Sequence, residues 1–167
     1  MIVRKETQKD FDEIYNLIKA AFETAEEADG DEQDHAVKLR NGSNYIPELA
    51  LVAVLNKKLI GHIMFTKTCI KGSDAACLLL SPVSVLLKHR KKGVGACLIN
   101  TGLSIARDLG YKAVFLCGEP AYYKRFGFCP VKQLGIDYAM DIPGQYVLGC
   151  ELKPGALRGV AGIIDIV

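Results

Sequence analysis

The sequence predicts a mixed α/β fold, on three observations. A helical period of apolar residues lies near the N-terminus, runs of aliphatic and β-branched residues fill the middle, and a second long helical period follows residue 93. Strand patterns that alternate with helical patterns are typical of a sheet covered by helices. A chain of 167 residues fits one domain, so we expect a single domain over residues 1–167.

The first elements are a short strand and a helix that faces the core. Ile2–Arg4 has a strand pattern, and the segment from Thr7 to Asp10 resembles a capping box, which satisfies free backbone amides at a helix start. Apolar residues then recur at spacings of three and four, on one face of a helix: Phe11, Ile14, Leu17, Ile18, Ala21 and Phe22. The acidic segment Glu23–Asp34 is expected to be a loop, followed by a short helix at His35–Arg40.

The middle of the chain predicts three strands. Leu49–Leu55 and Leu59–Ile70 are rich in aliphatic and β-branched residues, and the short link between them predicts an antiparallel hairpin. A turn at Lys71–Asp74 leads to a further strand over Ala75–Leu87. Pro82 lies inside this strand, where a proline removes one ladder donor and favours a bulge.

The second half predicts a long helix and several shorter elements. Val94, Leu98, Ile105 and Leu109 keep helical spacing, and Gly110 stands where a left-handed residue would end the helix. The later elements are a buried strand, a helix that begins at a proline, and two more strands (Ala113–Leu116, Pro120–Arg125, Gln145–Leu152 and Val160–Ile166).

Composition and charge are those of an ordinary globular protein, and they argue against a membrane-spanning or secreted one. Half of the residues are hydrophobic, and 21 basic side chains face 19 acidic ones, which is an ordinary globular balance. The longest apolar runs are far shorter than the roughly 20 residues that span a membrane, and the N-terminus has no secretory pattern. We therefore expect a soluble, cytoplasmic protein with no membrane partner.

The six cysteines are scattered, without a C-x-x-C pair or a histidine at metal-ligand spacing. We expect six small buried thiols, with neither zinc nor disulfides (Cys69, Cys77, Cys97, Cys117, Cys129 and Cys150).

The most informative segment joins the strand Ala75–Leu87 to the long helix. Here the basic run Lys88–Lys92 is followed by Gly93 and Gly95 at the helix start. Glycines let the backbone approach a ligand, and the start of a helix offers unpaired amides with partial positive charge. This segment predicts an anion site, although neither the Walker loop nor the dinucleotide fingerprint fits it.

Four patterns in this chain resemble the GNAT acetyltransferases. The R-x-x-G-x-G pattern at Arg90–Gly95, directly after a strand, resembles their acyl-CoA-binding signature. Pro120–Phe128 looks like the family element in which a tyrosine stands four residues before Gly-Phe. Glu48–Ala53 with Ile60–Phe65 resembles the second and third strands, and Glu151–Leu157 is similar to the tail of one branch of predicted bacterial N-acetyltransferases.

The resemblance implies a three-layer fold with a splayed, mostly antiparallel mixed sheet flanked by helices. It implies direct acetyl transfer from acetyl-CoA to a primary amine, without a metal. The amide of Val85 would hold the thioester carbonyl, and Tyr123 would be the general acid. The coenzyme contacts would come from Val83, Val85, Arg90, Lys91, Lys92, Gly93, Val94, Gly95, Ala96 and Tyr122.

The general base and the acceptor are less defined by the resemblance. Glu119, at a strand end beside Tyr123, is the best-placed carboxylate for the base. Glu26 or Glu27 could instead recruit a cationic acceptor. The acceptor is expected to be a small-molecule or peptide amine, and a homodimer is left open.

Other interpretations stay open beside these. Lys88–Lys92 could be a solvated charge run, Tyr123 a packed aromatic residue, and His62 a hydrogen-bonded structural histidine. Cys117 is disfavoured as an acyl-carrying nucleophile, because no histidine lies nearby in the sequence. The chain could also be a non-catalytic acetyl-CoA-binding module. A nucleic-acid-binding domain led by His89–Lys92 is disfavoured by the near-neutral charge.

Overall fold

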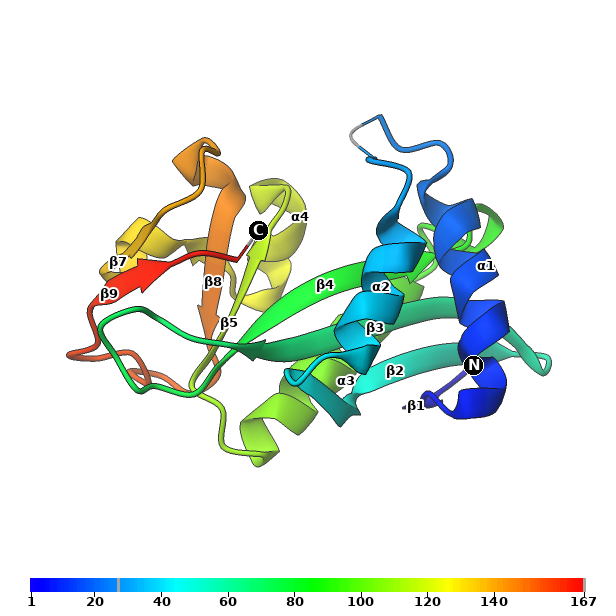
Figure 1. Ribbon diagram of the computed structural model, residues 1–167, viewed down its shortest axis with the longest axis horizontal. Helices are drawn as coiled ribbons and strands as arrows, with labels where there is room; N and C mark the ends of the chain where they lie inside the picture. The colour runs from blue at the N-terminus through cyan, green and yellow to red at the C-terminus, as the bar shows by residue number, and fades with distance from the viewer. Residues whose placement is uncertain (27, 167) are drawn as a thin grey trace. The chain divides into compact units, whose positions relative to one another are not determined.

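The structure is a computed structural model that describes residues 1–26 and 28–166. The mixed α/β fold class is confirmed: the main sheet is mixed and mostly antiparallel, with strand order β1-β2-β3-β4-β5-β8-β6, and helices flank it (Figure 1). The chain forms two compact units, one of Met1–Thr66 with Ser81–Gly102, the other of Lys67–Leu80 with Leu103–Val167. The single domain over residues 1–167 stays a prediction.

The first unit begins with β1 (Ile2–Lys5), a 3-10 turn (Gln8–Asp10) and α1 (Phe11–Phe22). The Asp10 carboxylate accepts the backbone amide of Thr7 at 2.8 Å, as the capping box predicts. The predicted helical face is confirmed, because four of its apolar residues are buried and the two at its ends are half-buried (Ile14, Leu17, Ile18, Ala21; Phe11, Phe22).

Helix α2 (Glu32–Asn41) begins three residues before the predicted His35–Arg40. The carboxylate of Glu32 accepts the backbone amides of Asp29 (2.7 Å) and Gly30 (3.1 Å), which stabilises an earlier helix start. The acidic loop is therefore shorter than predicted. Glu26 is exposed in it, and Glu27 lies outside the described residues.

The predicted hairpin is confirmed as β2 (Tyr45–Leu55) and β3 (Lys58–Thr68), which pair antiparallel. Its turn residues, Asn56 and Lys57, both have positive φ (50° and 66°), as a two-residue hairpin turn requires. Strand β2 begins earlier than predicted because Tyr45 already pairs with Thr66.

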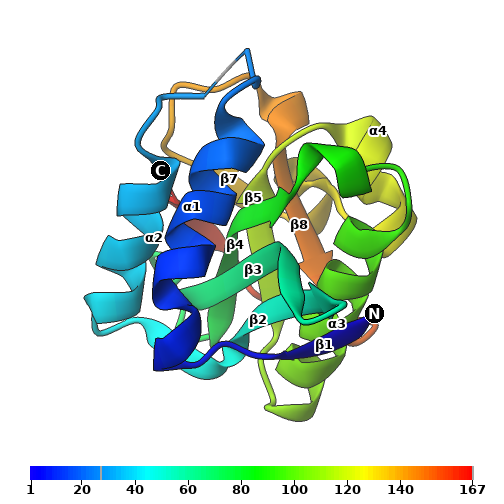
Figure 2. The same cartoon turned by 90° about the vertical axis from the view of Figure 1, so that its right-hand side faces the viewer.

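Helices cover both faces of this hairpin. Helices α1 and α2 lie side by side (Figure 2) and bury one apolar cluster with the strands: Ile14, Leu17, Ile18, Ala36, Val52 and Leu59. Neighbouring residues on a strand point to opposite faces. Val52 of this cluster pairs with His62, so the neighbouring Gly61 is turned to the other face, toward Val94 and Leu98 of α3 (Val94–Asp108). A side chain at Gly61 would meet Leu98 at 2.9 Å, so the glycine permits close packing of the helix.

A buried carboxylate links several elements of the first unit. Glu6, just after β1, accepts two hydrogen bonds from Arg40 of α2 (2.7 and 3.0 Å) and one from the hydroxyl of Tyr45 (2.8 Å). It also lies 2.9 Å from Nε2 of His62, whose predicted structural role this contact supports. Burial alone would raise the pKa of Glu6, but the hydrogen bonds from His62 and Arg40 outweigh it and lower the pKa to about 2.

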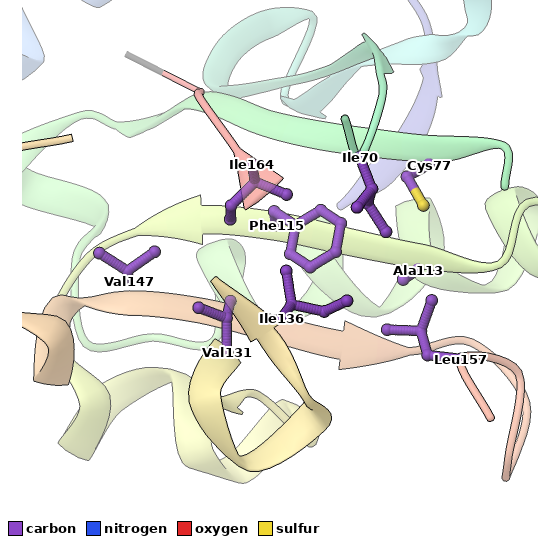
Figure 3. Packing of buried hydrophobic residues seen from close by; sticks show 9 residues of the cluster. All are labelled: Ile70, Cys77, Ala113, Phe115, Val131, Ile136, Val147, Leu157 and Ile164. Atoms are coloured by element: carbon purple, nitrogen blue, oxygen red, sulfur yellow. The ribbon is translucent and has the colours of Figure 1, made fainter. Parts of the chain in front are cut away.

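The second unit is built around β5 (Ala113–Cys117). This strand pairs in parallel with the first residues of β4 (Cys77–Val85) and antiparallel with β8 (Val147–Glu151), which also pairs with β6 (Cys129–Pro130). The Phe115 ring lies within an apolar cluster (Figure 3) that includes Ile70, Cys77, Ala113, Val131, Ile136, Val147, Leu157 and Ile164. A Cβ at Gly149 would come within 2.9 Å of this ring, so only glycine fits opposite it.

Helix α3 ends as the sequence predicts. Gly110 has a φ of 91°, and its amide bonds the carbonyl of Arg107 (3.1 Å), while the Tyr111 amide bonds that of Ala106 (3.2 Å). These two bonds satisfy carbonyls that a helix end leaves free.

Several short elements differ from the prediction. Helix α4 (Pro120–Tyr123) stops before Arg125, and a 3-10 turn over Lys124–Phe126 follows it. The two late strands are shorter than predicted, as β8 and β9 (Gly162–Ile164). Strand β6 and strand β7 (Ile136–Tyr138) were not predicted, because such short segments are held by pairing with distant strands and carry little local pattern.

The prediction that all six cysteines are buried is wrong. Cys77 and Cys150 are buried, whereas Cys69 and Cys117 are exposed, and all six are free thiols. Cys69 follows β3 and Cys117 ends β5, and residues at strand ends leave the core. Within residues 1–26 and 28–166, no helix is both long and apolar enough to cross a membrane.

We predict that Glu6→Gln lowers the free energy of unfolding at pH 7 by roughly 3–5 kcal/mol, because it leaves the Arg40 charge buried without its partner. The pKa of Glu6 is about 2, below its ordinary 4.5, so its stabilisation is present above pH 4.5 and is lost as the pH falls toward 2. Urea denaturation at several pH values measures both effects.

The matched control is Glu48→Gln, since Glu48 is exposed on β2. It should change stability by no more than about 0.5 kcal/mol. If Glu6→Gln had the same free energy of unfolding as the wild type at pH 7, the stabilising role of the Glu6 hydrogen bonds would be contradicted.

Candidate active site

The first part of the predicted site lies at the end of β4. Val83 and Val85 are half-buried, the alternating Pro82 and Ser84 are buried, and the Ser81–Pro82 peptide is cis. The parallel pairing of β4 with β5 runs from Cys77 to Leu79, and β4 then continues to Val85. The predicted thioester-binding residue therefore lies beyond the last residue of β4 that pairs with β5.

A tight turn carries the chain from β4 into α3. A 3-10 turn over Leu87–His89 is followed by two left-handed residues, Lys91 (φ 60°) and Gly93 (φ 83°). The Gly93 carbonyl accepts the Cys97 amide at 3.0 Å, which makes Gly93 the residue that opens the helix.

The amides of Val94, Gly95 and Ala96 therefore stand in the first helical turn, where no carbonyl one turn earlier can accept them. They carry the positive end of the helix dipole, as an anion site requires. A Cβ on Gly93 would meet no atom within 4 Å, so the space beside the backbone is open at that position.

The basic side chains of this turn differ in their surroundings. Lys91 and Lys92 are exposed. Arg90 is also exposed, but its guanidinium donates to two protein carbonyls, through Nε to Val85 (3.1 Å) and through Nη2 to Ala21 at the end of α1. The guanidinium of Arg90 is thus engaged by two carbonyls of the protein itself.

The second part of the predicted site is a group of aromatic residues in the other unit. The amides of Tyr122 and Tyr123 bond the Glu119 carbonyl (3.1 and 3.2 Å) in the helix that Pro120 opens. The two tyrosine rings meet edge to face at 5.0 Å, and Tyr123 packs against Phe128 at 5.7 Å. Burial raises the pKa of Tyr123 to about 12, with a smaller effect of Tyr122, so its hydroxyl stays protonated at neutral pH.

The neighbours of Tyr123 have different environments. The side chain of Glu119 is exposed, and its carboxylate makes no capping hydrogen bond to α4. The guanidinium of Arg125 lies 4.8 Å from the Tyr122 ring centroid, and its Nε donates to the Tyr122 carbonyl. Desolvation raises the pKa of the Cys117 thiol, and a protonated thiol is a poor nucleophile.

The structure therefore gathers Val83, Val85 and the turn Arg90–Ala96 in one unit, and Glu119, Tyr122 and Tyr123 in the other. Sequence reasoning missed Gly118, at which a Cβ would lie 2.6 Å from the Tyr123 ring. A glycine between a strand end and a proline is a signal of close packing that could have indicated it. The acceptor of Arg90, the Ala21 carbonyl, had no signal in the sequence.

We predict that Gly118→Ala displaces the Tyr123 ring, because no Cβ fits 2.6 Å from it. Overpacking of this kind costs about 1–3 kcal/mol of stability. Chemical denaturation measures the loss, and NMR of labelled tyrosine follows the ring. Gly42→Ala is the control, since a Cβ there meets nothing closer than 3.4 Å. Unchanged Tyr123 resonances in Gly118→Ala would refute the prediction.

Comparison with known proteins is consistent with this arrangement. The acetyltransferase (GNAT) domain family matches residues 2–131. The uncharacterized N-acetyltransferase YhbS of Escherichia coli K12 is 31% identical over 178 residues, which cover 99% of this chain and 95% of YhbS. The uncharacterized N-acetyltransferase YjhQ of the same strain is 34% identical over 125 residues, 74% of this chain and 66% of YjhQ.

Solved structures show the same relationship. The E. coli YhbS structure in complex with CoA has a TM-score of 0.89 and 27% identity, covering 99% of this chain and 89% of that one. A GNAT family acetyltransferase from Brucella melitensis, in complex with acetyl-CoA, has a TM-score of 0.72 and 35% identity, with coverages of 76% and 81%. The chain therefore belongs to the GNAT family of N-acetyltransferases and is an acyltransferase.

Proposed function

We propose that this protein transfers the acetyl group of acetyl-CoA to a primary amine by direct attack. The observation that carries the proposal is the start of α3, where the amides of Val94, Gly95 and Ala96 follow the left-handed Gly93. Three converging amides at the positive end of a helix of 15 residues suit the diphosphate of the coenzyme. The CoA and acetyl-CoA complexes of the two similar structures support the choice of ligand.

Arg90, Lys91 and Lys92 would assist this binding in different ways. The exposed ammonium groups of Lys91 and Lys92 raise the positive potential at the turn and attract the polyanionic coenzyme. Arg90 would contribute through its backbone, because its guanidinium donates to Val85 and Ala21.

The acyl end of the coenzyme would lie along the last residues of β4. Pairing of β4 with β5 ends at Leu79, so it does not engage the peptide groups of Val83 and Val85. An extended pantetheine arm could bond to such groups as an added strand does. The Val85 amide would then donate to the thioester carbonyl and stabilise the oxyanion of the tetrahedral intermediate.

The reaction begins when the neutral amine attacks the thioester carbon. The carbon–nitrogen bond forms, the carbon–sulfur bond then breaks, and the amine loses one proton while the leaving sulfur gains one. An alkyl amine is mostly protonated at neutral pH, since its pKa is about 10.4, and a base must therefore accept its proton. Glu119 is our candidate for that base, because its carboxylate is exposed beside Tyr123 and makes no capping bond to α4.

Tyr123 would assist departure of the sulfur. A thiol has a pKa of about 8.5, so full proton transfer from a phenol of pKa about 12 to the thiolate is uphill. The hydroxyl is therefore suited to donate a hydrogen bond to the sulfur as its negative charge develops, and the released thiolate would take its proton from solvent. Tyr122 would contact the pantetheine arm through its ring. The acceptor would be a small-molecule or peptide amine.

We predict that Gly93→Val or Gly95→Val weakens CoA binding about tenfold or more, because the added side chain obstructs the approach of the diphosphate to the amides. At Gly93 the φ of 83° adds backbone strain, which a β-branched residue tolerates poorly. Isothermal titration calorimetry with CoA measures the effect.

Gly110→Val is the matched control, because Gly110 also has a left-handed φ (91°) and no atom within 4 Å of an added Cβ, but it ends α3 rather than opening it. It should lose stability and keep its affinity for CoA. A Kd for Gly93→Val and Gly95→Val within twofold of the wild type would count against the proposed coenzyme site.

We predict that Tyr123→Phe lowers kcat by about 10²-fold or more, the usual contribution of a hydrogen-bond donor aimed at developing negative charge, and leaves the Kd of CoA nearly unchanged. The acceptor would be chosen from a panel of polyamines, aminoglycosides, amino acids and peptides. Each is incubated with acetyl-CoA, and release of the CoA thiol measures the reaction. Because the pKa of Tyr123 is about 12, its ionisation should cause no fall in kcat between pH 7 and 10.

Tyr122→Phe is the control for the neighbouring phenol and should retain most of kcat. An unchanged rate in Tyr123→Phe would rule out the role proposed for the Tyr123 hydroxyl. CoA binding by the wild type without turnover of any acceptor would favour the non-catalytic module instead.

A further inference from the structure

We propose that Arg90 is a positioning residue that couples coenzyme binding at α3 to the C-terminal end of α1, and through it to the segment that follows α1. The inference rests on the proposed function, since it requires the coenzyme to bind at the start of α3. It gives the arginine side chain a role of its own, separate from the phosphate contact that the backbone amides would make.

The guanidinium of Arg90 spans two elements of the first unit. Its Nε donates to the carbonyl of Val85 (3.1 Å), the last residue of β4, and its Nη2 donates to the carbonyl of Ala21 in the last turn of α1. Both are charge-assisted hydrogen bonds, which are stronger than neutral ones. One planar group with fixed donor directions therefore sets the distance between these two carbonyls.

The end of α1 has a particular need for this contact. The last four carbonyls of a helix have no donor within the helix. At the end of α3 a left-handed glycine, Gly110, supplies the closing bonds, whereas α1 runs into Glu23 in helical conformation (φ −57°, ψ −33°) without a glycine. The Phe22 carbonyl accepts the Ala25 amide at 3.2 Å, and the Ala21 carbonyl accepts Arg90. The cation also meets the negative end of the helix dipole.

The other side of the contact belongs to the coenzyme turn. The amide of Arg90 bonds the Leu87 carbonyl at 3.2 Å, which closes the 3-10 turn after β4. The left-handed residues Lys91 and Gly93 then lead directly to the amides that open α3. A diphosphate that fixes these amides also fixes the backbone of Arg90, and the guanidinium transmits this restraint to Ala21.

The consequence concerns the segment that continues from α1. Residues 23–26 and 28–31 connect α1 to α2, and Glu23 and Glu26 within them are exposed and acidic. Coenzyme binding would thus steady one end of a connection that carries negative charge, before a cationic acceptor arrives. An ordering effect of this kind appears as positive coupling between the two substrates.

The test is hydrogen exchange of the backbone amides of residues 20–25, measured with and without saturating CoA on the full chain. Wild-type protein should show exchange slowed about fivefold or more by CoA, because the helix end opens less often. In Arg90→Ala the same amides should exchange at one rate with and without CoA. The Kd of CoA should rise by less than in Gly93→Val, because backbone amides carry the main contact with the diphosphate, and Arg90→Lys should restore part of the CoA-dependent slowing.

Two further variants keep the test decisive. Lys88→Ala removes an exposed cation from the same turn and should keep the CoA-dependent slowing. If Arg90→Ala does not fold, as judged by thermal unfolding, Arg90→Gln, which removes the charge but keeps a polar side chain, makes the same comparison.

The outcomes separate this inference from the function on which it rests. CoA binding to the wild type without any change at residues 20–25 would overturn the coupling alone, as would full CoA-dependent slowing in Arg90→Ala. No CoA binding to the wild type by calorimetry, with no slowing at residues 93–97, would overturn the proposed function and the coupling together.

Discussion

The passage from β4 into α3 is the constraint on which the chemistry of the first unit depends. A chain leaving a strand must turn sharply to begin a helix, and here Lys91 and Gly93 do so with positive φ. The turn leaves the amides of Val94, Gly95 and Ala96 without carbonyls one helical turn earlier. The same geometry that allows the helix to begin therefore provides the donors on which the proposed coenzyme site depends. Arg90 holds this turn to both β4 and α1 through its two carbonyl contacts.

The first unit depends on a second polar interaction, far from the turn in sequence. Glu6 is buried, and an unpaired charge in its position would be strongly destabilising. Arg40, Tyr45 and His62 satisfy its carboxylate, so a group that could have disrupted the core instead joins α2 and the β2–β3 hairpin to β1. This arrangement explains why a short helix with few buried residues, α2, has a defined position in this unit.

The second unit places its aromatic residues by packing rather than by charge. Tyr123 contacts Tyr122 and Phe128, and Gly118 leaves the space that its ring occupies. Burial favours the neutral phenol, and this suits a hydrogen-bond donor more than a strong acid. The burial of the ring therefore supports the role of hydrogen-bond donor that we propose for this tyrosine.

The sequence by itself determined the elements with a strong local pattern. The apolar period of α1, the β2–β3 hairpin and the glycine that ends α3 were all predicted, because spacing and turn chemistry act between near neighbours. The Arg90–Ala96 segment was also recognisable, since glycines at the start of a helix have a local physical meaning. Only the tertiary structure decided which groups meet across the chain. The pairing of β6 and β7, the partners of Glu6 and Arg90, the fit of Gly118 against Tyr123 and the exposure of Cys69 and Cys117 all depend on residues brought together by folding. No periodicity records such contacts, because they arise from the packing of distant segments rather than from the conformation of any one of them.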